Sequence, residues 1–328
     1  MKIRIIAGII GAAAFLAVLY FSNIPFVFAA GMALVGVLAV YELLTALNIP
    51  KSLKISATIF AALTPLLSQV PSFLLGINPG FYPMENNPLV TLFLISDAIN
   101  SVIYLIFALA LLASLLISKK VEFAHTAKTF IAAVAITASL GYVIELIMWR
   151  ADGFTHGLPY APTPEGIYLV FLVAIAAWMT DIGGYFTGFV CGGKIFGKRK
   201  LAPNLSPKKT IEGAIGGVIF CVLFFFIAEL LATQIFGIWT TLIWTNWSIG
   251  LTEPTINWWT VFVIAPILSI CGMAGDLIAS KIKRENQVKD FGAIMPGHGG
   301  ALDRFDSLLV VAPVLYLIAW ILHRTPLG

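Results

Sequence analysis

The sequence predicts an all-α, polytopic integral membrane protein with about nine membrane-spanning helices, and three observations support this fold class. Of the 328 residues, 59% are hydrophobic and only 11% are charged, and the mean hydropathy is +0.96. Soluble domains carry about 25% charged residues. The apolar residues form separate runs of about the length that a bilayer requires. Almost all lysines and arginines fall between alternate runs, as they do in multi-pass membrane proteins.

Each predicted span is an apolar run close to the length of about 20 residues that crosses a bilayer. The first run follows Lys2 and Arg4, as a signal peptide would, but a second run begins just after Pro25, so we interpret the first as a retained helix. Pro65 interrupts the third run, and Asp97 lies near the start of the fourth. In chain order the predicted spans cover residues 5–21, 26–47, 55–77, 92–117, 130–149, 168–190, 211–236, 259–279 and 307–322.

The basic residues orient these spans. If the N-terminus is cytoplasmic and nine spans alternate, only Arg150 and Arg324 of the 20 lysines and arginines lie outside, which leaves 18 inside. Eight or ten spans would scatter the charges over both sides. The positive-inside rule therefore predicts a cytoplasmic N-terminus and an external C-terminus in the cell (inner, cytoplasmic) membrane. The net charge of +4, without a basic stripe on a soluble face, predicts no nucleic-acid partner.

Polar residues divide the chain into two parts. Residues 1–165 have short loops without a polar cluster and are predicted to form a scaffold of about five helices. Residues 166–328 are predicted to be the catalytic half, because two long cytoplasmic loops there concentrate glycine, lysine, aspartate and histidine. Isolated acids in the spans are expected to make structural pairs or to mark misplaced span ends; these are Glu42, Asp97, Glu145 and Glu229.

The first long loop, from Asp181 to Gly213, suggests a phosphate site. Asp181 lies at the cytoplasmic end of the sixth span, and a carboxylate at that depth should face the protein interior or a polar cavity. Ser206 and Pro207 suit the N-cap and first position of a helix, so the seventh span is predicted to start there. Lys208 and Lys209 would then oppose the helix dipole. A bound phosphate would resolve the conflict, and we favour it over simple membrane anchoring.

The second long loop follows the eighth span. Asp276, Ser280, Lys283 and Arg284 are spaced i, i+4, i+7 and i+8, so they share one helix face. The two basic residues suit the C-terminal end of that helix. Within the same region, Asp303 and Asp306 begin the ninth span.

Carboxylates from two helix ends, beside lysine and arginine, suit a magnesium–triphosphate site, because Mg²⁺ prefers one or two protein carboxylates with phosphate oxygens and water. Gly299 and Gly300 allow the backbone to approach a phosphate or metal closely. His298 stands beside these glycines and is interpreted as a functional contact rather than an established base.

These residues resemble the phosphatidate cytidylyltransferase (CDP-diacylglycerol synthase) family. The likeness is clear over about residues 168–322, and before that it rests on hydropathy. The stretch Asp181–Gly213 is similar to the second conserved block of the family. Four residues depart from the family pattern, but only at packing positions: Met295, Ala301, Ile182 and Gly184. The run that resembles the family signature contains Ser280, Lys283, Arg284, Lys289, Asp290, Gly292, Pro296, His298, Gly299, Gly300, Asp303, Arg304 and Asp306.

The resemblance implies a reaction of CTP with phosphatidic acid that yields CDP-diacylglycerol and pyrophosphate, for phospholipid biosynthesis at the cytoplasmic face of the bilayer. It implies Mg²⁺ held by Asp276 and Asp303, and leaves room for a neighbouring K⁺ and for a homodimer. The implied catalytic residues are Asp276, Asp303, Lys283, Arg284, Asp181, Asp306 and His298. The implied substrate-binding residues are Ser206, Lys208, Lys209, Ser280, Lys289, Arg304, Gly299 and Gly300.

Two other functions share part of this sequence pattern. A CTP-dependent membrane lipid kinase, such as a polyprenol kinase, shares the nucleotide and the setting but leaves CDP; the full pattern from Ser280 to Asp306 favours the transferase. A solute transporter would also contain acids within its spans. Transporters usually contain an internal repeat with broken helices at mid-membrane, whereas here the polar residues gather at one face and in one half of the chain.

Overall fold

The computed structural model describes residues 11, 13–24, 26–68, 88–118, 120–149, 163–195, 197, 200–203, 205–235, 258–293 and 299–324. Its contacts divide the chain into two compact units. The first contains Met1–Ile144, His156–Pro162 and Val288–Arg304. The second contains Glu145–Thr155, Thr163–Gln287 and Phe305–Gly328. The loop that carries Asp303 therefore belongs to the same unit as the N-terminal helices.

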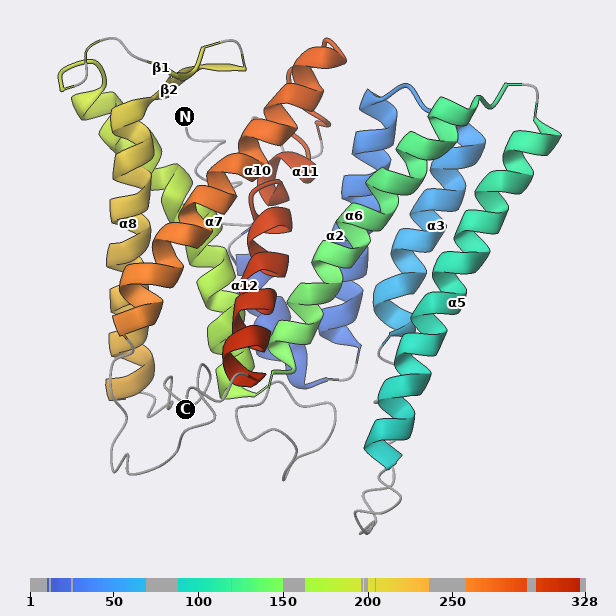
Figure 1. Cartoon of the computed structure of the whole chain (residues 1–328), viewed down its shortest axis with the longest axis horizontal. Coiled ribbons are helices and arrows are strands. Elements are labelled where there is room, and N and C mark those ends of the chain that lie inside the picture. Colours follow the sequence, from blue (N-terminus) through green and yellow to red (C-terminus); the bar gives the residue numbers. More distant parts are fainter. Residues whose placement is uncertain are drawn as a thin grey trace. The chain divides into compact units, whose positions relative to one another are not determined.

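The first unit is a helical assembly (Figure 1). Its elements are η1 (Phe21–Asn23), α2 (Val27–Ala46), α3 (Lys51–Leu67), α5 (Pro88–Ile117) and most of α6 (Phe123–Ile147). Helix α3 packs between α2 and α5. Its contact with α5 includes stacked rings of Phe60 and Phe107, whose centroids are 4.2 Å apart. Large apolar side chains thus fill this core.

The second unit combines four long helices with a short hairpin (Figure 1). Helix α7 packs against α8, and α10 contacts α7, α8 and α12. Strands β1 and β2 pair antiparallel just before α8. The elements are α7 (Pro164–Cys191), β1 (Lys200–Ala202), β2 (Ser206–Thr210), α8 (Ile211–Leu230), η3 (Leu231–Ile235), η4 (Thr260–Ile264), α10 (Ala265–Glu285) and α12 (Leu308–Arg324); α11 (Leu302–Phe305) runs from the first unit into the second.

Small residues allow α7 and α8 to approach closely. A Cβ added at Gly183 would lie 2.4 Å from the Cβ of Phe220, and one added at Gly217 would lie 2.7 Å from the Thr180 carbonyl oxygen. Such close approach through glycine is typical of helix pairs in membranes, where van der Waals packing contributes much of the association. The glycines of this pair therefore set the spacing of the two helices that carry the hairpin.

Replacing Gly217 by alanine is expected to lower the thermal unfolding midpoint of the purified protein in detergent. The new methyl group meets backbone rather than a flexible side chain, and overpacking of this kind costs about 1–3 kcal/mol. The matched control is Gly141→Ala in α6, where an added Cβ meets nothing within 4 Å. Equal midpoints for the two variants would contradict the close approach of α7 and α8.

The predicted all-α, multi-pass fold is confirmed. Seven helices among the described residues are long and apolar enough to cross a membrane. Helix α3 has 17 residues, so it is about 26 Å long, a little under the hydrocarbon thickness. The described part of the first predicted span, residues 11 and 13–20, is helical, and residues 5–10 lie outside the described part of the chain. The count of nine spans and their orientation stay predictions.

The start of the seventh span that the capping residues predicted was wrong, whereas the predicted apolar run 211–236 begins where the helix begins. Ser206 and Pro207 do not begin a helix but belong to β2, which pairs with β1 in the register Ala202 to Ser206 and Lys200 to Thr210. The helix begins at Ile211, and Thr210 is its N-cap: its side-chain oxygen accepts a hydrogen bond of 3.0 Å from the Gly213 N–H.

The electrostatics of the helix end explain the correction. A start at Ser206 would have placed two lysines in the first turn, against the helix dipole. The actual first turn contains the acidic residue Glu212, which the dipole favours. In addition, the backbone of residues 206–210 makes hydrogen bonds to β1, so these residues need no helix to satisfy their N–H and C=O groups.

Candidate active site

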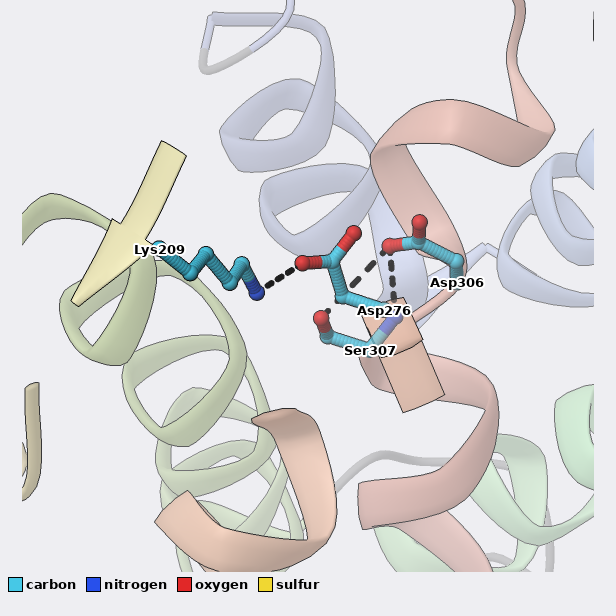
Figure 2. Close-up of polar contacts among 4 residues, drawn as sticks. All are labelled: Lys209, Asp276, Asp306 and Ser307. Atoms are coloured by element: carbon cyan, nitrogen blue, oxygen red, sulfur yellow. Dashed lines mark hydrogen bonds and ion pairs between the residues drawn. The ribbon is translucent and has the colours of Figure 1, made fainter. Parts of the chain in front are cut away.

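A lysine and an aspartate from distant parts of the sequence meet in the second unit. Lys209 on β2 donates from its Nζ to the Oδ2 of Asp276 on α10, and the two form an ion pair (Figure 2). The side chains are 28% and 21% exposed, respectively. Both groups are therefore partly shielded, so their attraction is stronger than that of a fully exposed pair. The hairpin thus places a cation directly on the carboxylate of α10.

A second carboxylate, that of Asp306, lies close to this pair. The Asp306 Oδ1 accepts a hydrogen bond of 2.7 Å from the Ser307 N–H (Figure 2). Its electrostatic neighbours include Asp276, Asp181 and Lys283. A Cβ at Gly275 would lie 2.7 Å from the Asp306 carbonyl oxygen, so α10 packs closely against this chain segment. Several acidic groups and two lysines therefore share one region of the second unit.

A cavity of about 470 Å³ opens beside β2. Its polar lining includes Asp181, Ser206, Lys208 and Lys209, all predicted site residues, and its apolar lining includes the rings of Tyr185 and Phe189. These two rings stack with centroids 6.5 Å apart and are 68% and 80% exposed. The remaining lining residues are Thr180, Gly184, Gly188, Leu201, Thr210, Gly213, Ala214 and Met273. The cavity is thus amphiphilic, with cations beside aromatic surface.

Helix α10 extends six residues beyond the predicted end of the eighth span, from 279 to Glu285. Ser280, Lys283 and Arg284 therefore lie on the same helix as Asp276, as their spacing predicted. Ser280 and Lys283 are half-buried and Arg284 is exposed. The two basic residues lie in the last turn, where the helix dipole favours cations. This end of α10 therefore offers positive charge to which a phosphate group could bind.

The first unit contains the other predicted metal carboxylate. The Asp303 Oδ2 accepts hydrogen bonds from the Phe291 N–H (2.9 Å) and from the Gly300 N–H (3.0 Å). Gly299 has a φ of +85°, a left-handed conformation that glycine adopts without a steric cost. A Cβ there would also lie 2.8 Å from the same Asp303 oxygen. The loop is therefore folded around the Asp303 carboxylate.

The structure says less about the other predicted site residues. Lys289 and Arg304 are exposed in the loop of the first unit, and nothing described tests their binding of substrate. His298 lies outside the described residues. Asp276 and Asp303 belong to different units, so their convergence on one metal ion stays a prediction.

Sequence reasoning did not identify Tyr185 and Phe189 as part of the cavity in the second unit, or Glu42 as a contact of the Asp303 loop in the first unit. The two rings follow Asp181 at intervals of four residues on α7, and this helical spacing was a usable signal. Glu42 was expected only to make a structural pair, and it does, with backbone N–H groups of the Asp303 loop. The expectation of structural pairing also holds for Glu229, whose Oε1 accepts a 2.5 Å hydrogen bond from the Tyr168 hydroxyl.

The sequence is similar to those of known proteins. The pattern of the Cytidylyltransferase family matches residues 2–322. A phosphatidate cytidylyltransferase of Bacillus subtilis (strain 168) is 32% identical over 320 residues, which is 97% of each chain. Phosphatidate cytidylyltransferases of Staphylococcus haemolyticus (strain JCSC1435) and Staphylococcus aureus (strain COL) are each 38% identical over 159 residues, which is 48% of this chain and 52% of each relative.

Proposed function

The chain belongs to the cytidylyltransferase family, and from this membership we propose that it transfers CMP from CTP to phosphatidic acid. The products are CDP-diacylglycerol, an intermediate for phospholipids, and pyrophosphate. The observation that carries the proposal is the Lys209–Asp276 pair beside an amphiphilic cavity. A nucleotide and a lipid phosphate need cationic groups, and a lipid also needs apolar surface next to them.

The reaction balances as a single displacement at phosphorus. A phosphate oxygen of phosphatidic acid forms a bond to the α-phosphorus of CTP, the bond from that phosphorus to the bridging oxygen of the β-phosphate breaks, and pyrophosphate leaves with the electron pair. Both reactants are anions, so neutralisation and alignment dominate the barrier. A phosphate monoester is already largely ionised near neutral pH, so the proposal requires no general base.

The side chains near Asp276 suit the magnesium ion that the family implies. Within the described residues, no three His, Cys, Asp or Glu side chains group tightly enough to bind a metal ion alone. Mg²⁺ typically takes only one or two carboxylates and fills its remaining positions with phosphate oxygens and water. Asp276 and Asp303 would hold it, and when bound it neutralises charge on the triphosphate.

The protein's own cations would hold the phosphates. Lys208 and Lys209 on β2 and the basic end of α10 at Lys283 and Arg284 supply positive charge without a metal. Lysine binds phosphate as a mobile point charge, and arginine can bind it in a bidentate manner. The exposed rings of Tyr185 and Phe189 would contact the apolar part of the lipid. Ser206 and Ser280 add hydroxyl groups to the same two surfaces.

The proposed setting is the cytoplasmic face of the cell membrane. Nine spans with the N-terminus inside would place both Lys209 and Asp276 on the side where 18 of the 20 lysines and arginines lie. Soluble CTP and a bilayer lipid are both available at that interface. Reaction with a membrane-impermeant thiol reagent, after single cysteines are introduced at Arg150 and Lys194, would test this orientation.

Purified protein in detergent is expected to release pyrophosphate from CTP only when phosphatidic acid and Mg²⁺ are both present. Pyrophosphate is measured by a coupled phosphate assay, and the lipid product by its incorporation of labelled cytidine. Omission of each component in turn is the control. Release of CDP with transfer of one phosphate to a lipid alcohol would instead identify a CTP-dependent lipid kinase, and no turnover of any lipid would contradict both enzymes.

A further inference from the structure

A buried glutamate from the second predicted span holds the loop that carries Asp303. Glu42 lies near the end of α2 and is only 3% exposed. Its Oε1 accepts a 3.0 Å hydrogen bond from the Ala301 N–H, and its Oε2 accepts a 2.9 Å hydrogen bond from the Leu302 N–H. A buried carboxylate is costly unless it is hydrogen-bonded, and bonds to a charged acceptor are among the strong ones. The two oxygens of this carboxylate therefore accept from the backbone N–H groups of two consecutive residues.

Two glycines of the loop leave room for this carboxylate. A Cβ at Gly292 would lie 2.2 Å from the Glu42 Oε1, and a Cβ at Gly300 would lie 2.3 Å from the Oε2. No real Cβ contact is this short, so both positions accept only glycine while Glu42 keeps its place. The glycines of the signature run thus accommodate a carboxylate of the protein itself.

The same few backbone groups connect Glu42 to Asp303. Asp303 binds the Gly300 N–H, and Glu42 binds the next two N–H groups along the chain. The carboxylates of Glu42 and Asp303 therefore accept from three consecutive backbone N–H groups, those of residues 300–302. Asp303 itself is the next residue along the chain. Ala301 and Leu302 directly precede Asp303, so a shift of their backbone moves the point from which the Asp303 side chain extends.

We infer that Glu42 is a positioning residue, which acts through the backbone of Ala301 and Leu302 to orient the Asp303 carboxylate toward the bound metal–nucleotide. This inference rests on the proposed function, since it takes Asp303 as the metal carboxylate. It also assigns a role in the reaction to the N-terminal helices, which otherwise serve as a scaffold. Outer partners that orient metal ligands typically change metal affinity or activity by about 10- to 100-fold when they are mutated.

The first test is Glu42→Gln, which keeps the shape but places an amide donor against one backbone N–H donor. We expect the Mg²⁺ concentration for half-maximal pyrophosphate release to rise about 10-fold. Without phosphatidic acid, the thermal stabilisation of the protein by CTP should also require about 10-fold more Mg²⁺. Asp303→Asn provides the reference for complete loss of the carboxylate.

The matched control is Glu229→Gln, because Glu229 is also a buried membrane carboxylate, 0% exposed, with the Tyr168 hydroxyl as partner. A glutamine oxygen can still accept that bond, so we expect an unchanged Mg²⁺ dependence. If Glu42→Gln and Glu229→Gln both match the wild type in Mg²⁺ dependence, the positioning role is overturned. If the wild type releases no pyrophosphate, the proposed function fails, and the thermal-shift comparison still decides the role of Glu42.

Further variants serve if Glu42→Gln does not fold. Glu42→Asp keeps the charge but withdraws the carboxylate by one methylene, and is expected to raise the Mg²⁺ requirement by a smaller factor. Gly292→Ala alone should weaken Mg²⁺-dependent stabilisation, because its methyl group displaces Glu42. In a Glu42→Ala background, Gly292→Ala should then weaken the Mg²⁺-dependent stabilisation no further, as expected for residues in direct contact. Additive effects of the two changes would overturn the inference.

Discussion

An Asp276→Asn variant is expected to lose about 100- to 1,000-fold in the kcat/KM for pyrophosphate release. The change preserves the size of the side chain but removes the negative charge that Lys209 contacts. Without that charge, Lys209 loses its counter-ion, and under the proposed function α10 would no longer hold a magnesium ion against the triphosphate. The variant is measured by initial rates at saturating phosphatidic acid across CTP and Mg²⁺ concentrations.

The matched control for this variant is Glu285→Gln, which removes a carboxylate from the last turn of the same helix. Glu285 is 62% exposed and pairs only loosely with Lys281 at 3.8 Å, so we expect its activity to stay within about twofold. A double variant of Lys209→Met with Asp276→Asn should lose less activity than the product of the two single losses, because contacting residues couple. Wild-type rates for Asp276→Asn would refute the metal assignment.

Asp303→Asn is expected to lose activity on a similar scale, about 100- to 1,000-fold, while the loop around it stays folded. An asparagine carbonyl oxygen can still accept from the Phe291 and Gly300 N–H groups that the Asp303 Oδ2 binds. The negative charge is therefore removed with little effect on the local hydrogen bonds. Pyrophosphate release and the thermal midpoint in detergent are measured together.

Asp303→Ala separates charge from structure at the same position. Alanine removes both the charge and the acceptor, so two buried donors lose their partner, at about 1–3 kcal/mol each. We expect Asp303→Ala to be inactive and also less stable than Asp303→Asn. Equal activity of Asp303→Asn and wild type would show that this carboxylate serves the loop alone.

The helices were predictable because lipid leaves the chain few choices. A backbone in the hydrocarbon region must satisfy its own hydrogen bonds, so each long apolar run becomes a helix. The boundaries were less certain where two capping residues competed. Ser206 and Thr210 both fit an N-cap, and the choice depends on whether Ser206–Thr210 pairs as a strand with Lys200–Ala202. That pairing has no local sequence signal.

The candidate site was predictable only where its residues share one helix. Asp276, Ser280, Lys283 and Arg284 have helical spacing, and α10 contains all four. Lys209 and Asp276 are 67 positions apart, and no periodicity connects them. Glu42 and Ala301 are 259 positions apart, and the partner of Glu42 is backbone, which has no residue preference to detect. Single-sequence spacing therefore identifies a helix face but not the elements that converge on it.

The hairpin before α8 gives the adjacent lysines Lys208 and Lys209 different surroundings. Side chains alternate between the two faces of a strand. Lys209 pairs with Asp276 and is partly shielded, whereas Lys208 is exposed beside the same cavity. One lysine therefore cannot compensate for loss of its neighbour, although their chemistry is identical. A one-residue shift in the register of β2 would exchange them, leaving Lys208 as the partner of the carboxylate and Lys209 in the solvent.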